Sequence, residues 1–192
     1  MIETLKIFVP QGLELLTLLS GIAVAVFVLF LLYAFSSGRI HMFRRLTYWI
    51  QHHYLLFGLL VSVVATGGSL FYSGVLGYTP CTLCWWQRIF MYPQVLLFAL
   101  ALWRRDSQFY RYALWLSVLG ALFAGYHYGL QIGFLTTDTP CSAVGYSASC
   151  SESFFVRYGY ITIPMMALTA FVMLIIFALC TRQRGDAIRY SK

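Results

Sequence analysis

The stretch "YTPCTLCWWQRIFMYPQ", Tyr78–Gln94, places a Cys-x-x-Cys pair directly before a long apolar run. The run Trp85–Trp103 has about the 20 residues that a helix needs to cross a bilayer. Arg88 lies inside this run, four residues after Cys84. A cation inside a membrane-spanning helix is costly and is by default a sign of function. The stretch therefore predicts a transmembrane helix that begins with two thiols and carries an arginine one turn further on.

The whole chain is far more apolar than a soluble domain. Of its 192 residues 60% are hydrophobic and 10% charged, and its mean hydropathy is +0.76. Soluble domains carry about a quarter charged residues. Because backbone groups in lipid must be satisfied within the segment, membrane-spanning stretches of this length are helices. The sequence therefore predicts an all-α integral membrane protein with five spans: Leu15–Phe35, Tyr54–Leu76, Trp85–Trp103, Tyr112–Leu135 and Ile161–Cys180.

Basic residues are predicted to gather on one side of the membrane. The connections after the first and third spans and the C-terminal segment hold ten of the thirteen Lys and Arg residues. Short loops rich in Lys and Arg stay in the cytoplasm, so the N-terminus is expected outside and the C-terminus inside. This topology accounts for the net charge of +7 and removes the argument for nucleic-acid binding.

The same topology puts four of the five cysteines on the outer side of the membrane. Cys81 and Cys84 lie at the outer end of the third span, and Cys141 and Cys150 lie in the connection between the fourth and fifth spans. Disulfides form and persist in that oxidising compartment. Cys180 lies at the inner end of the last span and is expected to be an inert buried thiol.

The first cysteine pair has the spacing of a redox motif at a helix start. Pro80 suits a helix start, and the unpaired N–H groups there lower the pKa of a thiol. Cys84 and Arg88 share one helix face, about 6 Å apart along the axis. Arg88 could stabilise a Cys84 thiolate or donate hydrogen bonds to a ligand carbonyl. The alternative is a structural disulfide and an arginine that snorkels to lipid head groups.

Three stretches carry a resemblance to a known family. "PCTLCWWQR", Pro80–Arg88, resembles the Cys-x-x-Cys-x-x-x-Arg signature of the DsbB family of disulfide-bond formation proteins. These are membrane oxidoreductases that reoxidise a thioredoxin-fold partner and reduce a quinone. "GYHYGLQIG", Gly125–Gly133, resembles the family's histidine-containing stretch. "YGYITIPMMALTAF", Tyr158–Phe171, is similar to the final helix of the short-loop, BdbC-type branch. The resemblance covers about Tyr54–Cys180.

The resemblance implies catalytic roles for both cysteine pairs. Cys81 and Cys84 would be the pair coupled to quinone, and Cys84 would carry the thiolate that contacts the quinone ring. Cys141 and Cys150 would exchange with a DsbA-like partner of thioredoxin fold, with Cys141 forming the mixed disulfide. Only eight residues separate this second pair, as in the short-loop branch.

Arg88 and His127 would line the quinone site, where the quinone is ubiquinone or menaquinone. By itself a histidine on a transmembrane helix also fits a simple hydrogen bond to a neighbouring helix. The resemblance further implies a multi-pass protein of the bacterial cytoplasmic (inner) membrane, with both cysteine pairs on the outer side.

Three segments are expected along the chain. Residues 1–53 would form an N-terminal transmembrane helix and a basic cytoplasmic loop, residues 54–180 a DsbB-like four-helix core, and residues 181–192 a basic cytoplasmic tail. The family core has four spans, so the Leu15–Phe35 helix is additional and has no assigned role.

Other functions remain as alternatives. A membrane protein with static structural disulfides is one, and a cysteine zinc site is another, although eight residues between Cys141 and Cys150 suit tetrahedral zinc poorly. We expect no metal. A b-type haem requires facing histidines, and His127 has no clear mate at its depth. A c-type haem is excluded because Trp85 follows Cys84 where histidine is required.

Overall fold

The computed structural model describes residues 2–36, 40–104, 109–135, 156 and 158–190. Nearly all of these residues lie in five α-helices. The helices are α1 (Ile2–Ser36), α2 (Ile40–Gly74), α3 (Thr82–Arg104), α4 (Tyr110–Gln131) and α5 (Ile163–Tyr190). The predicted all-α fold, with one helix preceding a four-helix core, is confirmed.

Four of the described helices are long and apolar enough to cross a membrane. Their spans are Lys6–Phe27, His52–Gly74, Tyr110–Gln131 and Ile163–Thr181. Helix α3 coincides with the predicted third span but is less apolar, because Gln87, Arg88 and Gln94 lie among its hydrophobic residues. Its 23 residues give a length of about 35 Å, which still matches the thickness of a bilayer core.

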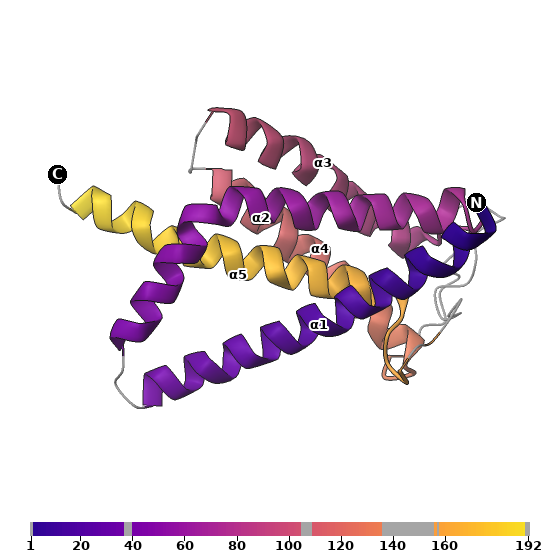
Figure 1. Cartoon of the computed structure of the whole chain (residues 1–192), viewed down its shortest axis with the longest axis horizontal. Helices are drawn as coiled ribbons and strands as arrows, with labels where there is room; N and C mark the ends of the chain where they lie inside the picture. Colours follow the sequence, from indigo (N-terminus) through magenta and orange to yellow (C-terminus); the bar gives the residue numbers. More distant parts are fainter. Residues whose placement is uncertain (1, 37–39, 105–108, 136–155, 157, 191–192) are drawn as a thin grey trace.

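Helices α2 to α5 form the bundle, and α1 lies along one side of it (Figure 1). Helix α5 packs against α4 and α2, and α3 packs against α2 and α4, while α1 touches α2 and α5. The beginning of α3, the end of α4 and the beginning of α5 all lie at the end of the bundle that holds the N-terminus (Figure 1). The first cysteine pair therefore lies at that end.

The centre of the bundle combines close helix contacts with a few internal hydrogen bonds. Phe171 of α5 is fully buried against Gly120 of α4, where any Cβ would collide with the phenyl ring. Ser117 Oγ donates to Gln94 Oε1 at 3.1 Å and so ties α4 to α3. Small residues and interhelical hydrogen bonds are the usual means of packing helices in lipid, where water drives no association.

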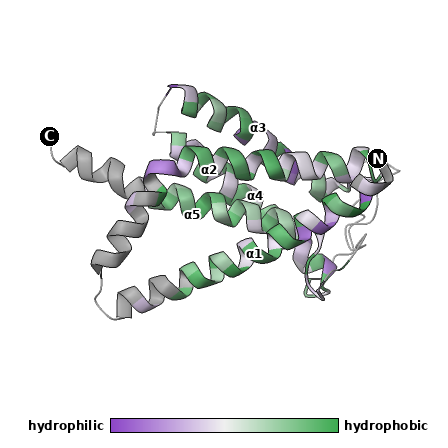
Figure 2. Ribbon diagram, in the orientation of Figure 1, coloured by the Kyte–Doolittle hydropathy of each residue, from purple (hydrophilic) through white to green (hydrophobic). Residues whose placement is uncertain are grey.

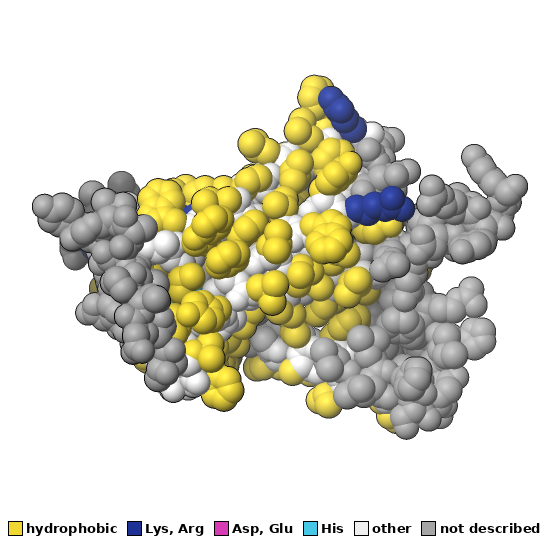
Figure 3. Space-filling model, turned by 180° about the vertical axis from the view of Figure 1, so that it is seen from behind, with side chains coloured by type: hydrophobic (Ala, Val, Ile, Leu, Met, Phe, Trp, Pro, Cys, Tyr) yellow, Lys and Arg dark blue, Asp and Glu magenta, His cyan; other side chains and the backbone are white. Residues whose placement is uncertain are grey.

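Hydrophobic residues predominate along the described helices (Figure 2), and the described part of the face in Figure 3 is mostly apolar. Large side chains point outward, among them Leu96 (68% exposed), Trp115 (69%) and Leu122 (64%). Apolar area on this scale is a liability in water but is the expected surface of a protein in lipid. On the face that Figure 3 shows, the coloured basic side chains lie toward one end and leave the middle apolar.

Candidate thiol site and adjoining cavity

Cys81 immediately precedes α3 and caps its first turn. Its carbonyl accepts a hydrogen bond from the N–H of Trp85 at 3.1 Å, and its Sγ accepts one from the N–H of Cys84 at 3.3 Å. A helix start has N–H groups without partners in the helix, and a thiolate is a good acceptor for them. The predicted start of a helix at the cysteine pair is confirmed.

The two thiols of this pair lie side by side. The Sγ atoms of Cys81 and Cys84 are 3.0 Å apart; Cys81 is buried and Cys84 is half-buried. The hydrogen bond with the Cys84 side chain, followed by the His127 imidazole, holds the pKa of the Cys81 thiol well below its usual range. Burial opposes this shift without overcoming it. The hydrogen bonds therefore favour negative charge on Cys81 in the reduced pair.

His127 of α4 lies against Cys81 and is itself oriented by Gln87. His127 Nε2 is 3.6 Å from Cys81 Sγ, and the side-chain amide of Gln87 donates to His127 Nδ1 at 3.0 Å. An amide nitrogen only donates, so Nδ1 is the acceptor and the imidazole proton is on Nε2, facing the sulfur. Gln87 and His127 are both buried, so this chain of contacts is shielded from water.

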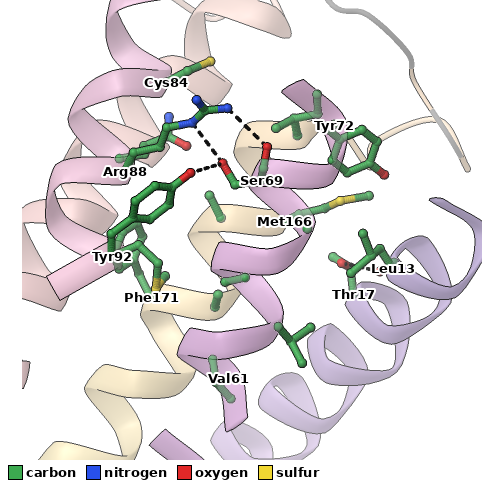
Figure 4. Close-up of a pocket in the computed structure, with 18 of the residues that line it drawn as sticks. Leu13, Thr17, Val61, Ser69, Tyr72, Cys84, Arg88, Tyr92, Met166 and Phe171 are labelled. Atoms are coloured by element: carbon green, nitrogen blue, oxygen red, sulfur yellow. Dashed lines mark hydrogen bonds between the residues drawn. The ribbon is translucent and has the colours of Figure 1, made fainter. Parts of the chain in front are cut away.

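Arg88 is held by α2 at the level of the cysteine pair. Its Nε donates to Ser69 Oγ at 3.0 Å and its Nη2 donates to the Ser69 carbonyl at 3.2 Å (Figure 4). Tyr92 also donates to Ser69 Oγ, at 3.2 Å, and the guanidinium lies 5.3 Å from the centre of the Trp85 ring. The side chain is thus bonded to a neighbouring helix rather than simply extended to the lipid head groups. Its two bonds to Ser69 use two of its five N–H donors.

A cavity of about 440 Å³ opens beside Cys84 and Arg88, between α1, α2, α3 and α5. Figure 4 shows Cys84 and Arg88 toward one end of this cavity and Val61 toward the other. Its walls are mostly apolar, from residues such as Val64 and Phe171. Ligand sites have this size range and this combination of apolar walls with a few polar groups.

The structure brings together four of the six predicted site residues, in two layers. Cys84 and Arg88 line the cavity, as their shared helix face predicts. Cys81 and His127 lie behind them, and His127 reaches the cavity wall only through Gln87. The other two, Cys141 and Cys150, lie outside the described residues. The catalytic and ligand-binding roles of all six stay predictions.

Three residues at this site carry interactions that sequence reasoning missed: Gln87, Ser69 and Tyr92. The only sequence signal was at Gln87, a polar side chain inside a span and one position before Arg88. Ser69 and Tyr92 carry no such signal, because serine and tyrosine are common in transmembrane helices.

The thiol site also has the composition of a metal site. The ligand atoms of Cys81, Cys84 and His127 lie within 4.8 Å of one another. Two thiolates on a tetrahedral zinc ion, with Zn–S bonds of ~2.3 Å, would be ~3.8 Å apart. The sulfur atoms here are 3.0 Å apart, so the two side chains would have to separate before both could bind one zinc ion.

Comparison with known proteins connects this chain to disulfide formation. Residues 51–181 match the family model "Disulfide bond formation protein DsbB". The chain is 41% identical over 122 residues to "Probable disulfide formation protein C" of Halalkalibacterium halodurans, covering 62% of this chain and 86% of that protein. It is 39% identical over 131 residues to "Probable disulfide formation protein" of Metapseudomonas resinovorans, covering 68% and 90%.

A third relative, "Disulfide bond formation protein C" of Bacillus subtilis, is 37% identical over 119 residues, which cover 62% of this chain and 84% of the relative. No solved structure matches the chain significantly. The matched region contains most of α2, all of α3 and α4, and α5 as far as Thr181, and it leaves out α1. Cys81, Cys84, Arg88 and His127 all lie within it. The chain belongs to the DsbB family of disulfide bond formation proteins and resembles its short-loop, BdbC-type branch.

Proposed function

We propose that this chain is a membrane thiol oxidoreductase that reoxidises a thioredoxin-fold partner and passes the electrons to a quinone. The observation that carries the proposal is that Cys84 and Arg88 line one apolar cavity at the end of a membrane helix bundle. A thiol supplies electrons there, and a guanidinium supplies hydrogen bonds to a carbonyl. The names of the relatives, all disulfide formation proteins, support the reaction class.

The electrons would move by two thiol–disulfide exchanges. A thiolate of the reduced partner attacks Cys141 of the Cys141–Cys150 disulfide, and the partner's second thiolate then displaces it, which leaves the partner oxidised and the pair reduced. The reduced pair in turn reduces the Cys81–Cys84 disulfide through a second mixed disulfide. When bound, a quinone would accept two electrons and two protons and leave as hydroquinone, so that two thiols become one disulfide.

The residues at and behind the cavity would then have different chemical roles. Cys84 is the thiol that faces the cavity. Cys81 lies behind it, where the N–H of Cys84 and the His127 imidazole favour its thiolate. The S–S bond between Cys81 and Cys84 would form as the two electrons and two protons of the pair pass to a quinone bound in the cavity. Gln87 keeps the imidazole proton on the side of the sulfur. The resemblance assigns the thiolate to Cys84, whereas the hydrogen bonds of the reduced pair favour Cys81; the assignment to Cys84 stays a prediction.

The overall reaction can be tested with purified protein under anaerobic conditions. Reduced thioredoxin-fold donor and excess ubiquinone or menaquinone are added, and donor thiols and quinone absorbance are followed together. We expect one quinone reduced for each donor dithiol oxidised, with a rate proportional to the protein. Donor oxidation without quinone loss, or no oxidation at all, would contradict the proposal, and zinc in the active protein would favour the metal alternative.

We also propose that the end of the bundle with the cysteine pair faces the outside of the bacterial cytoplasmic membrane. Arg104 and Arg111 flank the connection between α3 and α4, at the other end, in accord with the preference of basic loops for the cytoplasm. An impermeant thiol reagent applied to intact cells should label a variant that keeps only Cys141. A second variant lacks all five native cysteines and carries the substitution Ser107→Cys. The reagent should label it after the cells are permeabilised and not before. The opposite pattern would overturn both the topology and the proposed route of the electrons.

A further inference from the structure

Helix α1 lies outside the matched family region, yet it contributes to the cavity beside Cys84. The family match begins at residue 51, and α1 ends at Ser36. The α1 residues that line the cavity are Leu13, Leu16, Thr17 and Ser20. Their spacing of three, four and seven residues places all four on one face of the helix. The cavity therefore has a wall that the family core alone does not supply.

The α1 residues that form this wall pack closely against α2. A Cβ added at Gly68 of α2 would lie 3.1 Å from Leu13 Cδ1, so the absence of a side chain at Gly68 allows α1 to approach. Gly68 itself lines the cavity next to Ser69, which holds Arg88. The α1 wall and the guanidinium are thus attached to the same turn of α2.

The face that α1 turns to the cavity is effectively apolar although two of its four residues have hydroxyl groups. Thr17 Oγ1 donates to the Leu13 carbonyl at 2.8 Å, and Ser20 Oγ donates to the Thr17 carbonyl at 3.0 Å. Because these hydroxyl protons are used within the helix, they are not available to a ligand. The other side of α1 faces outward, with Leu19 55% exposed and Ile22 53% exposed. Helix α1 therefore separates the cavity from the lipid.

We propose that α1 forms part of the quinone site and holds the isoprenoid chain of a membrane quinone against Leu13, Leu16 and Thr17. This inference rests on the proposed function. Its basis is the polarity of the cavity: Arg88, Ser69 and Cys84 lie toward one end, where a carbonyl-bearing ring fits. The remaining walls, including the α1 face, match a hydrocarbon chain. An amphiphile with a polar ring and a branched apolar chain satisfies both parts, whereas a lipid acyl chain uses only the second.

Filling the cavity from α1 tests this assignment. Thr17→Phe places a ring in the cavity, and Leu19→Phe places the same ring on the outward face of the same helix as a matched control. We expect Thr17→Phe to raise the KM for a long-chain quinone by about tenfold, the effect of overfilling a packed site. The KM for a quinone with a single isoprene unit should rise much less, and single-turnover exchange with the partner should not change. Equal KM values for the two variants would overturn the inference.

A binding measurement separates this inference from the proposed function. A photoreactive isoprenoid quinone is cross-linked to the wild-type protein, and the labelled peptides are identified with and without excess unlabelled quinone. Competed labelling in α1 supports the inference even if the protein does not turn over quinone, which would contradict only the proposed function. Quinone binding without α1 labelling overturns the inference alone, and no quinone binding overturns both. In a parallel experiment a photoreactive phospholipid replaces the quinone probe. If it labels α1 and excess quinone does not reduce that labelling, the cavity binds lipid and the inference is wrong.

Discussion

Replacement of Cys84 by serine is expected to abolish quinone-linked turnover, with a loss of at least about 1,000-fold. Serine keeps the size of the side chain but removes the thiol that lines the cavity. Losses of this size follow the removal of an enzyme's nucleophile. The measurement is quinone reduction at saturating partner, together with a single-turnover assay in which the partner is in excess. Cys84→Ser should still oxidise about one partner dithiol through Cys141–Cys150 and then stop.

Two further variants make this result specific. Cys141→Ser should still bind quinone but should not accept electrons from the partner. It should therefore be inactive both in quinone reduction and in oxidation of the partner. Cys180→Ser is the matched control, because Cys180 is a buried cysteine on α5 that does not line the cavity. It should keep turnover within about twofold, as expected for a substitution away from the site. If Cys84→Ser turned over like Cys180→Ser, the proposed relay through the two cysteine pairs would be wrong.

The positions of the helices could be predicted because hydropathy is a local property of the sequence. The segment before α3 is the clearest case: the Cys-x-x-Cys motif and the apolar run after it predict a helix that starts at the pair, and α3 starts at Thr82. The i, i+4 spacing of Cys84 and Arg88 likewise predicts one shared face, and both residues line the cavity. Each of these inferences needs only residues within a few positions of each other.

The contacts that shape the site could not be predicted in the same way. Gln87 meets His127 across 40 residues, and Arg88 meets Ser69 across 19. Which polar side chains meet depends on the rotation and depth of each helix in the bundle, which hydropathy does not determine. For the same reason the sequence assigned no role to the first helix, whereas the structure places its Thr17 in the wall of the cavity. Cys141 and Cys150 lie outside the described residues.

Replacement of Arg88 by alanine is expected to lower kcat/KM for quinone by about 10²–10³-fold, the effect of losing an aligned electrostatic contact in an active site. A carbonyl oxygen gains negative charge as a quinone is reduced, and a guanidinium held beside it stabilises that charge in a half-buried, low-dielectric site. Arg88→Lys keeps the charge but loses the planar fork that allows one side chain to bond Ser69 and a ligand together. Its loss should therefore be intermediate. The measurement is the rate of quinone reduction against quinone concentration.

The competing role for Arg88 is structural, because the same side chain ties α3 to α2 through Ser69. Ser69→Ala removes one acceptor of that tie and leaves Arg88 in place, so it tests the tie without removing the cation. If Arg88 acts on the quinone, Ser69→Ala should change kcat/KM for quinone by much less than Arg88→Ala. Exchange between the partner and Cys141–Cys150 should be normal in both variants, since that step does not use the cavity. Equal kinetic losses in the two variants, with equal losses of thermal stability, would mean that the arginine serves the helix contact, and the charge within α3 would then need no ligand to explain it.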